Sequence, residues 1–248
     1  MTWRQNQGNG WARQGFATAN SIGLARRSND VLILGASQAG GGGVQAEFEV
    51  DQDQILLLDP AGHTFPAGAS MTHNGVTSTS AFHVWQNGPE KGLIRTASLA
   101  GKLLRTVTHS APGTALSNYL STEWTTALAE ADAVSLAPGV VVYIISPTDA
   151  AGSTIVQQIP GKLHQFERQV RAKYGPDCGI VLIGTIDTDQ PEYMTSRQHA
   201  REFCDSTTGL RRYIEPRWPQ QVTTPHMTAL GEFVCGMDVY EATRALYR

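Results

Sequence analysis

A short apolar run that ends in glycine constrains this chain more than any other feature. Residues Val31–Leu34 are all apolar, and Gly35 follows them directly. A run of this length is typical of a strand that is buried on both faces of a parallel sheet. Glycine permits a sharp turn after such a strand. The turn would place Ser37 at the carboxyl end of the strand, where open α/β sheets bind their ligands.

This stretch supports three interpretations of Ser37. Ser37 is a nucleophile, or the glycines at 40–43 cradle the phosphates of a dinucleotide, or Ser37 only caps the next helix. Asp59 lies 24 residues after Gly35, near the spacing of a ribose ligand, which favours the dinucleotide. Against it, residues 44–53 alternate like a strand where that motif needs a helix. An NAD(P)-binding Rossmann-type protein using Gly35–Gly43 is therefore the alternative to the hydrolase described below.

Further apolar runs alternate with stretches of helical spacing. Strands are expected at 48–50, 55–59, 81–86, 140–146 and 179–186. Helices are expected at 97–106, 115–128, 155–174, 197–204 and 227–247, with an interruption near Pro160. Residues 60–95, rich in Gly, Pro, Ser and Thr, should form a long loop or several short strands. This alternation predicts an α/β fold over residues 30–248, with a mostly parallel sheet in a three-layer α/β/α sandwich.

Residues 1–29 differ in composition from the rest of the chain. A segment rich in Gln, Asn and Gly lies between Trp3 and Trp11, and arginines follow it. Low complexity favours a flexible tail, whereas tryptophan with arginine is typical of anchoring contacts. We interpret these residues as an N-terminal arm, an attachment segment that orders against a partner subunit or against its own domain.

Charge and composition exclude several classes of function. The net charge is −3 and the chain has no basic block, so binding to nucleic acid is not expected. Cys178, Cys204 and Cys235 share no metal-ligand spacing, and we interpret them as buried, reduced thiols that hold no metal. The sequence has no apolar run of about 18 residues and no signal peptide. We therefore expect a protein that is made in the cytoplasm and does not insert into membranes.

Turns elsewhere in the chain carry residue types that suit a hydrolase. The stretch Asp149–Ile155 follows a strand end, so its backbone N–H groups are expected to face the same pocket as Ser37. Gly184 ends a third strand. His226 stands before the last helix, where a general base could meet Ser37, although a plain surface cap is also expected there. Small residues after His226 should let the last helix pack closely on the sheet.

The order and spacing of these pieces resemble the SGNH hydrolase superfamily, most closely its branch of sialic-acid and carbohydrate O-acetylesterases. The nucleophile of that branch lies in a G-Q-S-N block, which here is Gly35–Gln38. Its G-G-T-S-I block is similar to Ala151–Ile155, and Pro112–Trp124 is similar to the helix before it. The resemblance implies an SGNH/flavodoxin-like fold and ester hydrolysis without a cofactor.

The last two blocks of this branch are degenerate here. Of W-x-Q-G-E-S-D, only Gly184 and Asp187 survive, and D-x-x-H has become T-T-P-H at Thr223–His226. In the family, serine attacks an acyl carbon, histidine takes its proton and aspartate orients the imidazole. Thr223 stands in the place of that aspartate and cannot stabilise an imidazolium by charge. Loss of the acid lowers the rate by roughly 10⁴ in serine proteases, and Asp187 or Asp189 are candidates to replace it.

By this resemblance Ser37 and His226 are the catalytic pair, and the oxyanion hole involves Ser37, Gly152 and Gly184. Two hypotheses follow, an active carbohydrate O-acetylesterase or a degenerate esterase (a pseudoenzyme) that kept a glycan-binding cleft. The partner is then a cell-surface polysaccharide or an acetylated sugar. Similar domains occur in bacteriophage tails, which predicts a place in a virion or phage-like particle, attached to other subunits through residues 1–29.

Overall fold

The computed structural model describes residues 29–37, 39, 68–78, 88–185, 190–206, 210–217 and 227–246. Within them, seven strands form one sheet in the order β3-β2-β4-β1-β5-β6-β7. Neighbouring strands are parallel, except that β3 is antiparallel to β2. The strands are β1 (Val31–Gly35), β2 (Ser70–His73), β3 (Val76–Ser78), β4 (Arg105–Ser110), β5 (Val140–Ile144), β6 (Gly179–Ile183) and β7 (Arg211–Ile214).

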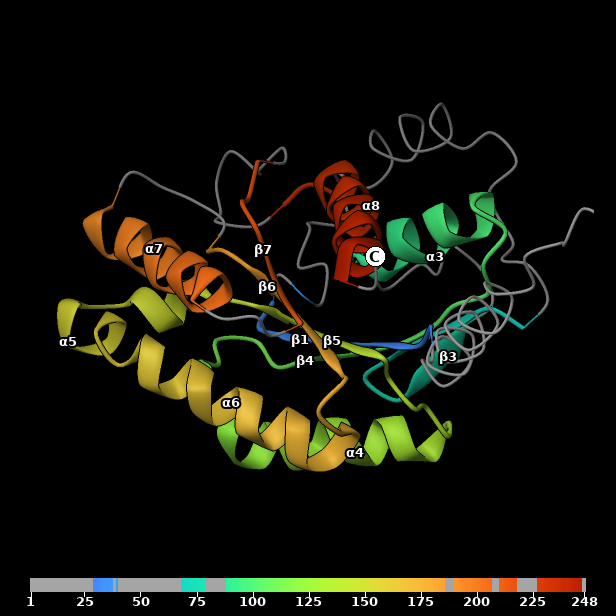
Figure 1. Ribbon diagram of the computed structural model, residues 1–248, viewed down its shortest axis with the longest axis horizontal. Coiled ribbons are helices and arrows are strands. Elements are labelled where there is room, and N and C mark those ends of the chain that lie inside the picture. Colours follow the sequence, from blue (N-terminus) through green and yellow to red (C-terminus); the bar gives the residue numbers. More distant parts are fainter. Residues whose placement is uncertain are drawn as a thin grey trace, which may run out of the picture.

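Helices cover both faces of this sheet, as Figure 1 shows. On one face α3 and α8 share a hydrophobic cluster with Val31 and Ile33, and on the other α4, α6 and α7 share one with Leu32 and Leu34. The predicted three-layer α/β/α sandwich is confirmed. The helices are α3 (Glu90–Leu99), α4 (Thr122–Ala133), α5 (Ser153–Val156), α6 (Ile159–Tyr174), α7 (Pro191–Asp205) and α8 (Ala229–Leu246), with 3₁₀ turns η1 (Asn118–Leu120) and η2 (Pro147–Ala150).

The three apolar runs identified in the sequence are the central strands. Every residue of β1, β5 and β6 is buried, because successive side chains point to opposite faces and both faces carry helices. The predicted break near Pro160 is also confirmed, since α5 ends at Val156 and α6 begins at Ile159. The strands expected at 48–50, 55–59 and 81–86 lie outside the described residues.

The helix predicted at 97–106 is wrong. Helix α3 begins at Glu90 and ends at Leu99, and residues 105–110 form strand β4 between β2 and β1. The pattern misled because β4 is polar in sequence, R-T-V-T-H-S, although five of its six residues are buried. Part of the Gly- and Ser-rich region 60–95 forms the short strands β2 and β3, as the second of our two interpretations expected.

Helices α3 and α8 cross in backbone contact. A Cβ on Gly92 would overlap the carbonyl oxygen of Phe233, and one on Gly236 would overlap that of Pro89. The small residues of the last helix therefore serve a close crossing with α3 as well as packing against β6 and β7. This crossing sets the first turn of α8 against the first turn of α3.

The predictions about cysteines, membranes and the arm have different outcomes. Cys178, Cys204 and Cys235 are free and buried, as expected. No helix in the described part of the chain is long and apolar enough to cross a membrane. In the same part no group of three or more His, Cys, Asp or Glu side chains could hold a metal ion. The proposed arm lies outside the described residues apart from Asn29 and remains a prediction.

Candidate active site

Ser37 lies just beyond β1, at the carboxyl edge of the sheet. The turn is closed by the N–H of Ala39, which donates to the carbonyl oxygen of Ala36 over 3.0 Å. A Cβ on Gly35 would lie 2.9 Å from the Cβ of Ala39 and 3.1 Å from the carbonyl oxygen of Ile144, so only glycine fits. Ser37 is half-buried. The sequence argument for a sharp, glycine-dependent turn is confirmed.

The strands that flank β1 determine which other segments lie near Ser37. Gly35 pairs with Ser110 of β4 on one side and with Ile144 of β5 on the other. Because these strands are parallel, the segments that follow β4 and β5 leave the sheet beside Ser37. Strand β6, which carries Gly184 after it, is one strand further away.

The two glycines predicted for the oxyanion hole differ in their surroundings. Gly152 precedes α5 with extended backbone, and no atom of the other described residues lies within 4 Å of the position of a Cβ. Its N–H makes no hydrogen bond within the described ranges, so it can serve as a donor. The N–H of Gly184 instead donates to the carbonyl oxygen of Ile214 over 3.2 Å. A Cβ on Gly184 would overlap the hydroxyl of Tyr213, so glycine is needed there for space.

The remaining predicted site residues cannot be placed. Asp187, Asp189, Thr223 and His226 lie outside the described residues, as do the glycines at 40–43 and Asp59 of the dinucleotide alternative. Their roles therefore stay predictions.

A loop after β4 is a feature that the sequence analysis missed. Residues 111–116 form an irregular segment beside Gly35 and are followed by η1 and α4, whereas the helix predicted from sequence began at residue 115. Gly113 in this loop is exposed and has a φ of 71°, which favours glycine. The signal was present as Pro112-Gly113 after a buried strand, but the polar sequence of β4 concealed that strand.

Asp149 ties this loop to the segment after β5. Its carboxylate accepts hydrogen bonds from the N–H of Leu116 (2.6 Å), the N–H of Ser146 (3.1 Å) and the hydroxyl of Tyr143 (3.0 Å). Burial raises the pKa of Asp149, and the three hydrogen bonds and the charge of Lys162 oppose that rise. The two loops that flank Ser37 are thus held in one arrangement by a buried acid.

The residues before α3 contact the Ser37 turn, and α8 packs against the start of α3. A Cβ on Gly88 would lie 2.7 Å from the carbonyl oxygen of Ala39 and would overlap the carboxylate of Glu90, so the Ser37 turn and α3 are in close contact there. Burial, and then the charge of Glu90, hold the pKa of Glu232 in α8 well above its usual range. Met227 is fully buried in the hydrophobic cluster that also contains Ala39.

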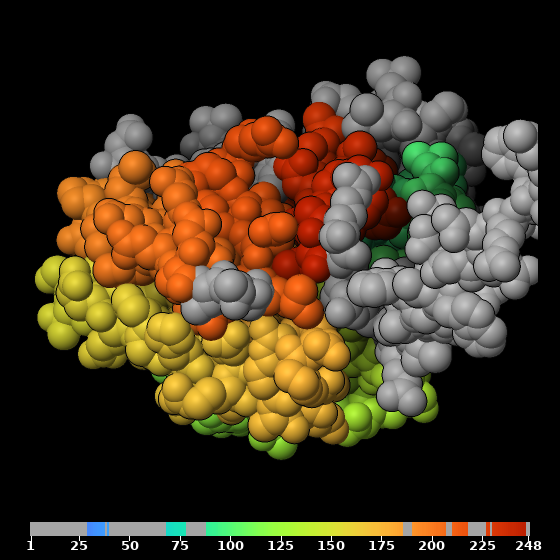
Figure 2. Space-filling model, viewed as in Figure 1, coloured from blue at the N-terminus to red at the C-terminus, as the bar shows by residue number. Residues whose placement is uncertain are grey.

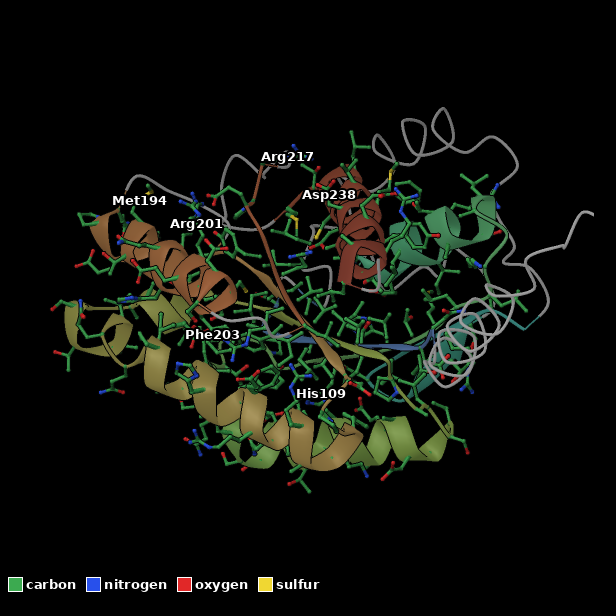
Figure 3. All side chains as sticks on the ribbon, viewed as in Figure 1. His109, Met194, Arg201, Phe203, Arg217 and Asp238 are labelled. Atoms are coloured by element: carbon green, nitrogen blue, oxygen red, sulfur yellow. The ribbon has the colours of Figure 1, made fainter. Side chains whose placement is uncertain are left out.

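A surface cavity of about 430 Å³ lies along α7 rather than at Ser37. Its charges are largely paired, since Arg201 and Arg197 both contact Glu215. Figure 3 shows Met194 and Arg201 on α7, and Figure 2 shows α7 and α8 forming much of this face of the molecule. Because its charged groups already pair with one another, we assign no chemistry to this cavity.

No protein-family model matches this chain, and no curated protein matches it in sequence. Solved structures do match. A protein from Arabidopsis thaliana aligns with a TM-score of 0.66 at 10% identity, covering 88% of this chain and 98% of its own. A carbohydrate acetylesterase from Xanthomonas citri aligns with a TM-score of 0.65 at 10% identity, over 88% of this chain and 56% of its own. A family two carbohydrate esterase from Cellvibrio japonicus aligns with a TM-score of 0.53 at 14% identity, over 89% of this chain and 62% of its own.

At such identities the likeness shows the fold. This fold is the one found in carbohydrate esterases, in agreement with the SGNH-like fold that the sequence resemblance implied. The chain spans little more than half the length of the two bacterial esterases, so their activities are not transferred with the fold.

Proposed function

We propose that this protein is a glycan-directed, carbohydrate-esterase-like protein with weak O-acetylesterase activity at Ser37. One observation supports this above all others. In a fold shared with carbohydrate esterases, the loops after β4 and β5 leave the sheet beside the glycine-dependent turn that carries Ser37, and Gly88 before α3 contacts that turn. Open α/β sheets bind ligands at this edge.

The chemistry assigns each part a role. The hydroxyl of Ser37 attacks the acetyl carbon, and backbone N–H groups stabilise the oxyanion that forms. Gly152 and Gly113 are the proposed donors beside the N–H of Ser37, because they follow the two strands that flank β1. Gly184 contributes space instead of a donor, since its N–H is already bonded to Ile214.

His226 is the proposed general base. Its neighbour Met227 packs in the same hydrophobic cluster as Ala39, which supports an approach to Ser37. Thr223 leaves this base without the usual acid, so we expect slow turnover, with Asp187 or Asp189 as the proposed substitutes. If turnover is absent and the sugar still binds, the protein is the degenerate, glycan-binding form.

Acetate release from an O-acetylated xylo-oligosaccharide tests this proposal. Wild type should release acetate slowly, and Ser37→Ala should reduce the release to background. Ser153→Ala is the matched control, because Ser153 is an exposed serine beside Gly152. Thr223→Asp should raise the rate, because a carboxylate fixes the imidazole tautomer and stabilises the imidazolium. A saturable interaction with NADH and none with the sugar would support the dinucleotide alternative instead.

The setting in a phage-like particle stays a proposal that rests on residues 1–29. Deleting them should abolish assembly with other subunits while leaving the melting temperature of the remaining domain nearly unchanged. A deletion that unfolds the domain would show that these residues belong to its core.

A further inference from the structure

A serine, a histidine and a glutamate form a continuous hydrogen-bonded array beneath α3. Ser110 Oγ lies 3.2 Å from Nε2 of His73, and Nδ1 of the same imidazole lies 3.2 Å from Oε1 of Glu90. The three residues come from the ends of β4 and β2 and from the start of α3. Their connectivity is that of a serine-hydrolase triad, which is recognised by geometry and not by sequence order.

The fold explains why these residues meet. In the parallel pair β2–β4, His73 is the register partner of Thr108, so it lies diagonally beside Ser110 at the carboxyl edge. Glu90 is the first residue of α3, which packs over both strands. The array also borders the Ser37 turn, since Ser110 pairs with Gly35.

Neighbouring groups fix where the protons lie. The side-chain amide of Asn74 donates to Ser110 Oγ over 3.2 Å, which leaves the hydroxyl hydrogen of Ser110 to point at His73 Nε2. The Glu90 carboxylate accepts from the hydroxyl of Thr108 over 3.3 Å and from His73 Nδ1–H. With Nδ1 of His73 donating to the carboxylate, Nε2 is the atom that accepts from the Ser110 hydroxyl.

Glu90 and the neighbouring buried acid Glu232 differ in their hydrogen-bond donors. Glu90 contacts His73 and Thr108, whereas neither carboxylate oxygen of Glu232 has a hydrogen-bond partner among the described residues. Burial, and then the charge of Glu90, hold the pKa of Glu232 well above its usual range, which favours its neutral form. Glu90 is therefore the acid that can stabilise an imidazolium at His73.

Access to the array is narrow. Ser110 retains 8% of its surface, compared with 2% for His73 and none for Glu90. Of the three residues, Ser110 keeps the most surface, at the carboxyl edge of the sheet. So little surface favours a small electrophile, whereas Ser37 is more open.

We propose that Ser110 is a second serine nucleophile, with His73 as its general base and Glu90 as a positioning residue, and that it takes small acyl donors. Ser110 Oγ forms a bond to the acyl carbon while its proton passes to His73 Nε2. The leaving alcohol takes this proton as its C–O bond breaks. Water then hydrolyses the acyl-Ser110 ester, again through His73. This assignment does not depend on Ser37.

Diisopropyl fluorophosphate is the probe, because it is small and reacts with activated serines. Ser110 Oγ displaces fluoride from phosphorus, and peptide mass mapping of the full-length protein locates the adduct. We expect a time-dependent adduct on Ser110 that is absent in Ser110→Ala. His73→Gln should slow its formation by roughly 10²–10⁴, the usual contribution of a general base. His164→Gln is the matched control, because His164 is exposed on α6.

Glu90→Gln is the second variant, and it should slow the reaction less than His73→Gln because it leaves the base in place. Thermal unfolding of each variant shows whether it is folded. An adduct-free Ser110 in folded wild type would overturn the proposal, as would an equal rate in folded His73→Gln. An adduct on Ser37 alone overturns this proposal and leaves the proposed function standing. An adduct on Ser110 alone supports this proposal and leaves the proposed function to the oligosaccharide assays.

Discussion

Ser37 and Ser110 end neighbouring strands, but their surroundings differ. Ser37 sits in a half-buried turn, and the proposed donors around it are backbone N–H groups of loops after β4 and β5. Ser110 is nearly enclosed, and its hydroxyl contacts the side chains of His73 and Asn74, while His73 in turn contacts Glu90. In the proposed Ser37 site, Thr223 stands in sequence where the family has its acid, whereas the Ser110 array contains Glu90.

This difference separates two tasks that a single hydrolase site usually combines. Open loops with unused N–H groups can hold a large substrate and stabilise an oxyanion. An enclosed serine with a hydrogen-bonded base can react, but only with a small partner. We infer that substrate size distinguishes the two serines, and the following predictions use that difference.

Gly236→Ala should have the largest effect, because it would damage the support of the Ser110 array. The added methyl would overlap the carbonyl oxygen of Pro89, directly before Glu90, and force α3 and α8 apart. We expect a loss of about 3 kcal/mol in the free energy of unfolding, measured by urea denaturation. Gly161→Ala is the control, because nothing lies within 4 Å of its Cβ position. Equal stability of the two variants would contradict the close crossing.

Ser37→Ala should reduce turnover of the acetylated oligosaccharide by about 10²-fold. A full triad accelerates the reaction by roughly 10⁶. Dividing by the roughly 10⁴ that is lost with the acid leaves a factor of about 10². Ser110→Ala should leave that turnover within about twofold and instead reduce hydrolysis of 4-nitrophenyl acetate, a small ester. Steady-state rates of both variants on both esters give the comparison. A loss of both activities in Ser110→Ala would mean that the two serines act as one site.

Asp149→Asn should weaken the Ser37 region and spare the Ser110 array. The amide cannot accept from both Ser146 N–H and Tyr143 while it also accepts from Leu116. A loss of about 2 kcal/mol in unfolding free energy is expected, together with slower oligosaccharide turnover. Asp132→Asn changes an exposed acid paired with Lys173 and is the control. A slower fluorophosphate reaction at Ser110 in Asp149→Asn would show that the two regions are coupled.

The smallest expected effect is that of His109→Gln on the pH dependence of stability. His109 lies on the opposite face of β4 from Ser110. Burial alone would lower its pKa, but hydrogen bonds to Glu130 and Glu123 and their charges outweigh burial and raise it. The protonated form thus stabilises the fold at pH values below the unfolded pKa. This stability is lost as pH rises through the raised pKa of the folded state.

The expected change is about 1 kcal/mol or less, seen as a fall in the urea midpoint with rising pH. His109→Gln should flatten that pH dependence without altering the rate at Ser110, because the two side chains face different helices. An unchanged pH profile in His109→Gln would contradict the role of the Glu130–His109–Glu123 contact.

The layers of the fold were predictable from sequence because β1, β5 and β6 are buried on both faces and therefore continuously apolar. Strand β4 was not predictable, because its buried side chains are polar and their partners are distant in sequence. Thr108 donates to Glu90, and Ser110 contacts His73. The start of α3 was placed seven residues late for the same reason. Glu90 and Lys91 are buried although they are charged.

The residues of the candidate site were likewise only partly predictable from the sequence. Gly35 and Ser37 were identified because a strand and its turn are contiguous in sequence. The Ser110 array joins residues separated by 17 and 37 positions, which no local pattern can connect. Asp149 was passed over as part of a loop, although it binds the backbone of Leu116, 33 positions away.

Binding of the O-acetylated xylo-oligosaccharide to full-length Ser37→Ala, measured by isothermal titration calorimetry, tests the central claim most directly. The variant removes the proposed turnover and leaves the proposed cleft, so active and degenerate forms of the site should bind alike. We expect saturable binding with one site per chain. A flat titration at millimolar sugar, with the variant folded and wild type releasing no acetate, would contradict a glycan-directed cleft at Ser37.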